Sequence, residues 1–132
     1  MSDDLALDSN GATVVMATAS DERYPPEHML DGKESTFWST TGLYPHEFIV
    51  ALSEMSKLSK VKVWSSSVRK LTVEKSDSAT GHFEKLFEIE FQDKHNRLQT
   101  EVHQVNCKAQ YLKFIIGSGW DDFCTIHKVS IM

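Results

Sequence analysis

KVKVWSSSVRKLTVEK, residues 60–75, carries the plainest structural pattern of this chain. Apolar side chains alternate with lysines in Val61-Lys62-Val63-Trp64, and a similar alternation returns in Leu71-Thr72-Val73-Glu74. A period of two places the apolar side chains on one face of a β-strand and the polar ones on the other. The run Ser65-Ser66-Ser67 between the two segments is typical of a bend or bulge, so we expect two successive strands here.

The same alternation recurs in short segments on both sides of this stretch. With the two above, strands are expected at Thr13–Thr18, Glu47–Leu52, Lys60–Ser65, Val68–Lys75, Phe83–Phe91, Leu98–Asn106, Gln110–Ile116 and Thr125–Ile131. One short helical turn is expected at Pro26–Leu30, because proline suits a first turn and Asp31-Gly32 ends it. The pattern predicts an all-β fold, an antiparallel β-sandwich of the jelly-roll type with about eight strands.

The length of 132 residues suits one hydrophobic core, and we expect a single jelly-roll domain over residues 1–132. Residues 1–10 are expected to be either loosely ordered or a first strand. No apolar run approaches the roughly 20 residues of a membrane span, and the acidic start is unlike a signal peptide. The sequence therefore predicts a cytoplasmic protein without membrane insertion, in which Cys107 and Cys124 are reduced, buried thiols.

The charge balance and the scattered histidines argue against two function classes. Acidic residues outnumber basic ones by 19 to 14, which gives a net charge of -5. Binding to a nucleic acid backbone needs clustered lysines and arginines, so nucleic acid is not an expected partner. The six histidines stand apart from one another, without a motif around a serine or cysteine, so we do not expect an enzyme.

Residues 17–42 interrupt the strand pattern with a long segment rich in oxygen-bearing side chains. Asp31 and Thr36 are five residues apart, and Gly32 between them allows a sharp turn. A carboxylate, a hydroxyl and nearby backbone carbonyls could therefore converge on a hard cation. Calcium takes about six to eight such oxygen ligands. An aspartate capped by local amides, with Thr36 bonded to Asp31, explains the same residues without metal. The spacing leaves both interpretations open.

The same segment resembles a known family. Leu30-Asp31-Gly32, then Thr36, then Trp38-Ser39-Thr40 are similar to the first conserved block of galactose-binding-like, or discoidin-type, jelly-roll domains. A closer resemblance, over about residues 13–130, is to the jelly-roll subunits of intraflagellar transport, also called small heat-shock-like. It rests on Ala17-Thr18 through Glu27, Thr40-Thr41-Gly42, Glu47-Phe48-Ile49 and Tyr111 to Ile116.

The broader family implies a set of calcium ligands. They are the carboxylate of Asp31, the hydroxyl of Thr36 and the backbone carbonyl of His28, and a carbonyl of Lys33 or Glu34 could join them. The family often closes the site with a glutamate near the C-terminal strand, but residues 125–129 contain no acidic side chain. The resemblance also implies that Trp38 packs in the core beside the site.

The closer resemblance implies a non-catalytic subunit of the intraflagellar transport B complex. Such a subunit would form a heterodimer with a Rab-like small GTPase, contact other complex B subunits, and support cargo transport in the cytoplasm and the cilium or flagellum, with Ca²⁺ bound. The alternative is a calcium-stabilised carbohydrate-binding module in which Trp120 is the sugar platform. Trp120 could equally close the end of the barrel or anchor a partner.

Overall fold

The computed structural model describes residues 4–18, 22–40, 43–78, 80–94 and 97–132. Within them the elements are seven strands and two short 3-10 helices. The helices are η1 (Asp8–Asn10) and η2 (Pro26–Leu30); the strands are β1 (Thr13–Ala17), β2 (Trp38–Ser39), β3 (His46–Ser66), β4 (Val68–Ser76), β5 (Glu84–Glu90), β6 (Gln99–Gly119) and β7 (Thr125–Ile131). The predicted all-β fold and the predicted turn at Pro26–Leu30 are confirmed.

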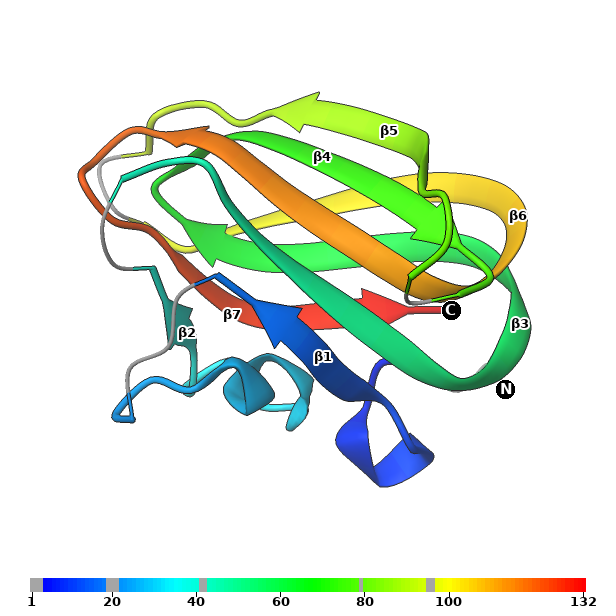
Figure 1. The fold of residues 1–132 in the computed structure, drawn as a ribbon. Coiled ribbons are helices and arrows are strands. Elements are labelled where there is room, and N and C mark those ends of the chain that lie inside the picture. Colours follow the sequence, from blue (N-terminus) through cyan, green and yellow to red (C-terminus); the bar gives the residue numbers. More distant parts are fainter. Residues whose placement is uncertain (1–3, 19–21, 41–42, 79, 95–96) are drawn as a thin grey trace.

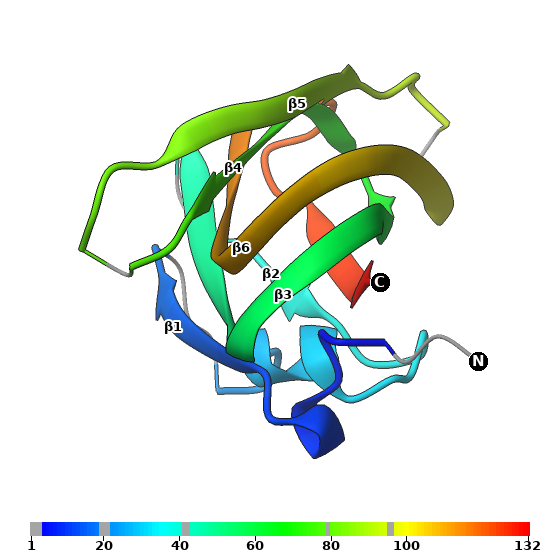
Figure 2. The same cartoon turned by 90° about the vertical axis from the view of Figure 1, so that its right-hand side faces the viewer.

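All strand pairs in the described residues are antiparallel, and they join in the order β2-β7-β3-β6-β4-β5, with β1 added to β3. The two longest strands, β3 and β6, pair with each other and run as curved ribbons through the molecule (Figure 1). Seen from the right of that view, their curvature folds the sheet over itself to form a sandwich (Figure 2).

Four of the expected strands are joined into two. The segments 47–52 and 60–65 both lie in β3, and 98–106 and 110–116 both lie in β6, apart from residue 98. Register shifts between Ala51 and Ser56 and between Leu58 and Lys60 interrupt the β3–β6 pairing. Bulges of this kind bend a strand without ending it, which is why a break in the alternation did not mark a loop.

The core lies between the curved halves of the sheet and is closed by η2. Trp38, which the family resemblance placed in the core, is fully buried and meets Phe48 edge-to-face at 5.2 Å between ring centroids. Phe48 in turn stacks on Phe114 at 4.8 Å. These rings bury a large apolar area, the main favourable term in folding. The core thus anchors β2 and the loop that precedes it.

The segment 4–10 is held by the C-terminal strand. Leu5 N donates to Ile131 O at 2.7 Å, and the Asp4 carboxylate accepts from Ile131 N at 3.0 Å. The one regular element of residues 4–10 is the 3-10 helix η1.

The two cysteines do not form a disulfide: Cys124 is buried, whereas Cys107 is half-buried and departs from the expectation of full burial. No helix in the described residues has the length and apolar character needed to cross a membrane.

Candidate functional site

The loop between η2 and β2 holds the residues that the sequence singled out. The helix η2 has proline in its first turn, buries Met29 and Leu30, and ends at Leu30 with Asp31 as its C-cap. Gly32 follows with φ of +80°, a left-handed conformation that glycine adopts without strain. This turn directs the chain back over the end of η2, so that Thr36 returns to the level of Asp31.

Three oxygen atoms converge in this loop. Thr36 Oγ1 donates to Asp31 Oδ2 at 2.6 Å and lies 3.4 Å from the carbonyl oxygen of His28. Asp31 Oδ1 accepts from Lys33 N at 2.9 Å. The structure therefore brings together His28, Asp31 and Thr36, the residues expected to hold calcium. It also contains the hydrogen bonds of the metal-free interpretation, so calcium remains a prediction.

The chemistry of this donor set suits a hard cation. A carboxylate, a hydroxyl and a carbonyl are the ligand types of calcium, whereas zinc requires nitrogen or sulfur. No cluster of three or more His, Cys, Asp or Glu side chains suitable for a metal occurs in the described parts of the chain. A cation in this loop would therefore depend on carbonyl and hydroxyl oxygens, and on water, for most of its ligands.

A histidine from β7 holds the far side of the loop. His127 Nδ1 lies 2.8 Å from the carbonyl oxygen of Glu34, and because a carbonyl only accepts, Nδ1 carries the proton. His127 Nε2, 3.1 Å from Thr125 Oγ1, is then the acceptor when the ring is neutral. This contact occurs in the strand where the broader family often has a glutamate ligand. Sequence reasoning missed it, although the lack of an acidic residue at 125–129 was a signal.

An aromatic column extends from this histidine along the loop. The His127 ring contacts Phe37 at 4.9 Å between centroids, and Phe37 stacks on Tyr24 at 4.7 Å. His28 Nδ1 lies 3.3 Å from the carbonyl oxygen of Phe37. The candidate cation loop is thus packed against Tyr24.

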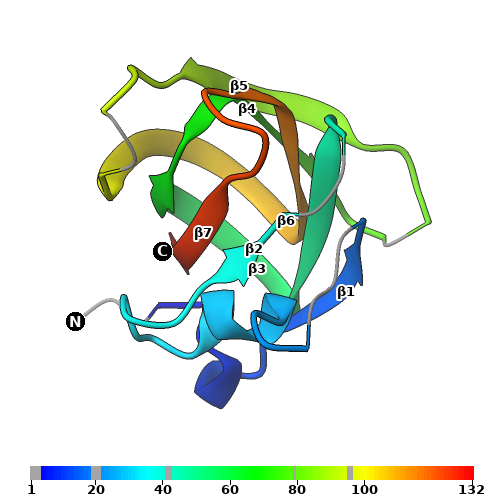
Figure 3. The same cartoon turned by 90° about the vertical axis from the view of Figure 1, so that its left-hand side faces the viewer.

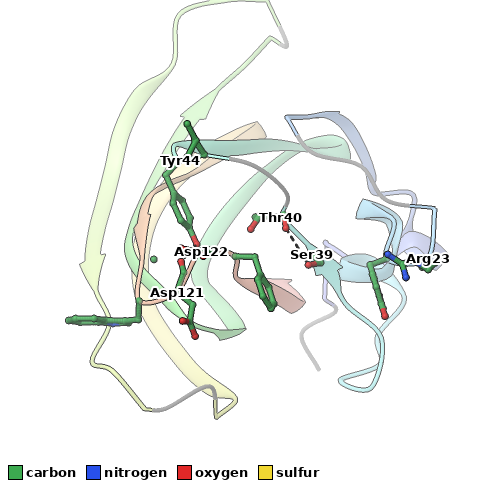
Figure 4. A pocket seen from close by; sticks show the side chains of 11 residues that line it. Arg23, Ser39, Thr40, Tyr44, Asp121 and Asp122 are labelled. Carbon is green, nitrogen blue, oxygen red and sulfur yellow. Dashed lines mark hydrogen bonds between the residues drawn. The ribbon is translucent and has the colours of Figure 1, made fainter.

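Beyond this column lies a pocket of about 960 Å³. Figure 3 faces the end of the sandwich at which the β6–β7 loop lies. The walls of the pocket come from residues 23–24, the end of β2, residues 43–44 before β3, and the β6–β7 loop. The lining residues are Arg23, Tyr24, Ser39, Thr40, Leu43, Tyr44, Gly119, Trp120, Asp121, Asp122 and Phe123. Figure 4 shows Asp121 and Asp122 on one side of the pocket and Arg23 on the opposite side. We call this the end pocket.

Hydrogen bonds between its walls hold the end pocket together. Cys124 N donates to Thr40 Oγ1 at 2.9 Å, and Thr40 N donates to Cys124 O at 3.0 Å. The Tyr44 hydroxyl donates to the carbonyl oxygen of Asp121 at 3.0 Å, which ties the β2–β3 loop to the β6–β7 loop. Burial raises the pKa of Tyr44 far above its ordinary value, and burial also raises that of the Cys124 thiol.

Trp120, the proposed sugar platform, is fixed at the rim of the end pocket. Its Nε1 donates to the carbonyl oxygen of Phe91 at 3.1 Å, and its backbone N donates to Ser67 O at 2.8 Å. The Arg69 guanidinium lies over the ring, 4.7 Å from its centroid. One face of the indole is therefore covered by a cation, and Trp120 is tied to the residues directly before β4 and directly after β5.

Comparisons with known proteins agree with this architecture. The model of the F5/8 type C domain family matches residues 14–129. Among solved structures, CpGH89CBM32-5 from Clostridium perfringens, in complex with GalNAc-β-1,3-galactose, superposes with a TM-score of 0.85. The two chains cover 98% and 99% of each other at 17% sequence identity, a likeness that concerns the fold.

Two curated relatives are similar along nearly the whole chain. Intraflagellar transport protein 25 of Chlamydomonas reinhardtii is 52% identical over 98% of this chain and 69% of its own length. The human intraflagellar transport protein 25 homolog is 40% identical over 96% of this chain and 90% of its own length. The chain therefore folds as an F5/8 type C domain and belongs to the intraflagellar transport protein 25 family.

Proposed function

We propose that this chain is a non-catalytic subunit of the intraflagellar transport B complex, which forms a heterodimer with a Rab-like small GTPase and supports ciliary cargo transport. The observation that carries the proposal is the identity of 52% with intraflagellar transport protein 25, across nearly the whole chain. A subunit of this kind works in the cytoplasm and in the cilium or flagellum, where it contacts other complex B subunits.

The side chains support a binding role over catalysis. A nucleophilic site needs a nucleophile, a base and an orienting group within hydrogen-bond reach. His127 instead bonds the Glu34 carbonyl and the Thr125 hydroxyl, and His103 stacks on Phe87 at 4.0 Å. These histidines hold neighbouring strands and loops together, and function then depends on surface complementarity.

Calcium is the second part of this proposal. The Thr36 hydroxyl lies within hydrogen-bond reach of both the Asp31 carboxylate and the His28 carbonyl, and all three groups offer oxygen ligands to a cation. The bound ion would supply a fixed positive charge that ties η2 to the loop before β2. His127 holds that loop from β7 through the Glu34 carbonyl and leaves the Asp31 carboxylate to the ion.

Thermal unfolding with and without calcium tests this site. A ligand that binds only the folded state adds about 2.7 kcal/mol at 100 times its Kd, or about 10 °C in Tm for a domain of this size. Asp31→Ala should abolish the calcium-dependent rise in Tm. Asp8→Ala, which removes an exposed carboxylate from η1, should keep it.

The contribution of the hydrogen bonds can be separated from that of calcium. Asp31→Ala also removes the bonds from Thr36 and Lys33, which lowers Tm in chelator as well. The informative quantity is therefore the increment in Tm between chelator and millimolar calcium for each variant. A wild-type Tm that does not change with calcium would remove the metal from the proposal and leave the pairing with the GTPase standing.

A further inference from the structure

We propose that the end pocket is the surface on which the GTPase partner docks, and that the docking segment presents a lysine or arginine beside an apolar side chain. This inference rests on the proposed pairing and adds to it the place and the chemistry of the contact. It is carried by the apolar rim, the acidic wall and the rigid floor of the pocket.

Exposed apolar side chains gather at the end pocket. Seven large hydrophobic residues are exposed in the described part of the chain, and three of them line this one pocket. Leu43 is 92% exposed, Phe123 58% and Trp120 37%. Clustered apolar exposure, in contrast to single scattered residues, marks interaction sites. With about 960 Å³, the pocket is at the upper end of the roughly 300–1,000 Å³ typical of ligand pockets.

The negative charge of the pocket wall favours a partner segment that carries a basic group. Asp121 and Asp122 are adjacent, exposed residues of the β6–β7 loop, and neither belongs to an ion pair within the described residues. Figure 4 places them together, away from Arg23 across the pocket. The chain as a whole carries a net charge of -5. Both the local and the overall charge favour a basic group on the incoming segment and speed its approach.

The same charges disfavour two other occupants. A second copy of this chain would bring another net charge of -5 to an already acidic surface. An anionic lipid surface would be repelled by Asp121 and Asp122, although Leu43 and Phe123 could insert into it. A sugar could stack only on the other face of Trp120, since Arg69 covers one face.

Hydrogen bonds connect the walls of the end pocket without any partner present. Tyr44 bonds the Asp121 carbonyl across two loops, and Thr40 exchanges hydrogen bonds with Cys124 beneath them. A surface that is already held in place loses less conformational entropy when a partner binds. The exposed side chains at its rim are therefore presented on a rigid frame.

Calorimetric titration of the purified Rab-like GTPase into this protein tests the inference. Phe123→Asp and Leu43→Asp should each weaken binding at least tenfold, because interface-centre apolar residues are binding hot spots. The matched control is Val102→Asp, which changes an exposed apolar residue in the first half of β6, outside the end pocket. All three positions are exposed, so thermal melts should show folded variants.

Charge reversal tests the chemistry of the docking segment. The double variant Asp121→Lys/Asp122→Lys should slow association by about tenfold at low salt, and the difference should shrink as salt screens the charges. Replacement of both by asparagine should have a smaller effect in the same direction. Faster association of the lysine variant would overturn the assignment of a basic docking segment.

Each outcome separates the inference from the proposed function. If the wild type binds the GTPase and the end-pocket variants bind equally well, the partner docks elsewhere and only the inference fails. If the wild type does not bind, the proposed pairing fails and this inference fails with it. Binding to a glycan array that Trp120→Ala abolishes, without GTPase binding, would make the end pocket a sugar site.

Discussion

Among the glycines of the described residues, Gly119, which lines the end pocket, has the least room for an added Cβ. A Cβ built on Gly119 would overlap the Tyr44 hydroxyl, and it would lie 2.7 Å from Tyr44 Cζ and 2.8 Å from the carbonyl oxygen of Ser67. Neither neighbour can yield freely. The Tyr44 hydroxyl is bonded to Asp121, and the Ser67 carbonyl accepts from Trp120 N. We therefore predict that Gly119→Ala moves the Tyr44 ring and breaks its bond to the β6–β7 loop.

The cost follows from two contributions. Forcing an extra carbon into a packed site costs about 1–3 kcal/mol, and a lost hydrogen bond about 1 kcal/mol. The lower entropy of alanine in the unfolded chain returns about 0.4–1 kcal/mol. We expect Gly119→Ala to lower the free energy of unfolding by about 1–3.5 kcal/mol, a large part of the roughly 5–15 kcal/mol that holds a typical domain folded.

Urea unfolding monitored by tryptophan fluorescence measures this change. The matched control is Gly117→Ala in the same strand, where the added Cβ meets only Lys70 Cβ at an ordinary 3.9 Å. That variant should be neutral or up to about 1 kcal/mol more stable. In a Tyr44→Phe background the cost of Gly119→Ala should fall but persist, because the ring carbon and Ser67 O remain close. Equal stabilities of the two alanine variants would refute this packing argument.

Two further perturbations test the loop and the buried thiol. His127→Ala should speed amide exchange at residues 33–37 in the calcium-free protein. It should also weaken calcium binding about tenfold, because contacts outside the ligand set position the ligands of a metal. The control is His82→Ala, which changes an exposed histidine and should have neither effect. Burial raises the pKa of Cys124 in the folded state, so above about pH 8.5 the thiol ionises first in the unfolded chain. The free energy of unfolding should therefore fall as pH rises from 8 to 9.5, and Cys124→Ala should flatten that fall; an unchanged slope would count against it.

The strands could be predicted from alternation because a half-buried sheet imposes a period of two. β7 occupies the predicted residues 125–131, and β4 extends only one residue past the prediction. The continuity of β3 was not predictable in this way, because residues 53–57 at its bend are mostly exposed and show no apolar side. The pair Trp38–Ser39 is too short to carry any period, so β2 was missed.

In the candidate site too, contacts between residues close in sequence could be predicted, whereas contacts between distant residues could not. The oxygen cluster was predictable, because Asp31 and Thr36 are close in sequence and a left-handed glycine folds the chain between them. His127 contacts Glu34 from 93 residues away, so only the sheet topology brings the two together. The end pocket likewise combines residues 23–24 with residues 43–44 and the β6–β7 loop. Trp120 was noticed in the sequence, but its contact with Arg69 depends on the β4–β6 pairing.

Co-purification with the GTPase tests the central claim most directly. This chain and the Rab-like GTPase of the intraflagellar transport B complex should be coexpressed, then separated by size exclusion with light scattering at micromolar concentration. The proposed function predicts a single peak with the mass of a one-to-one complex. Two separate peaks, each with the mass of one free chain, would contradict it.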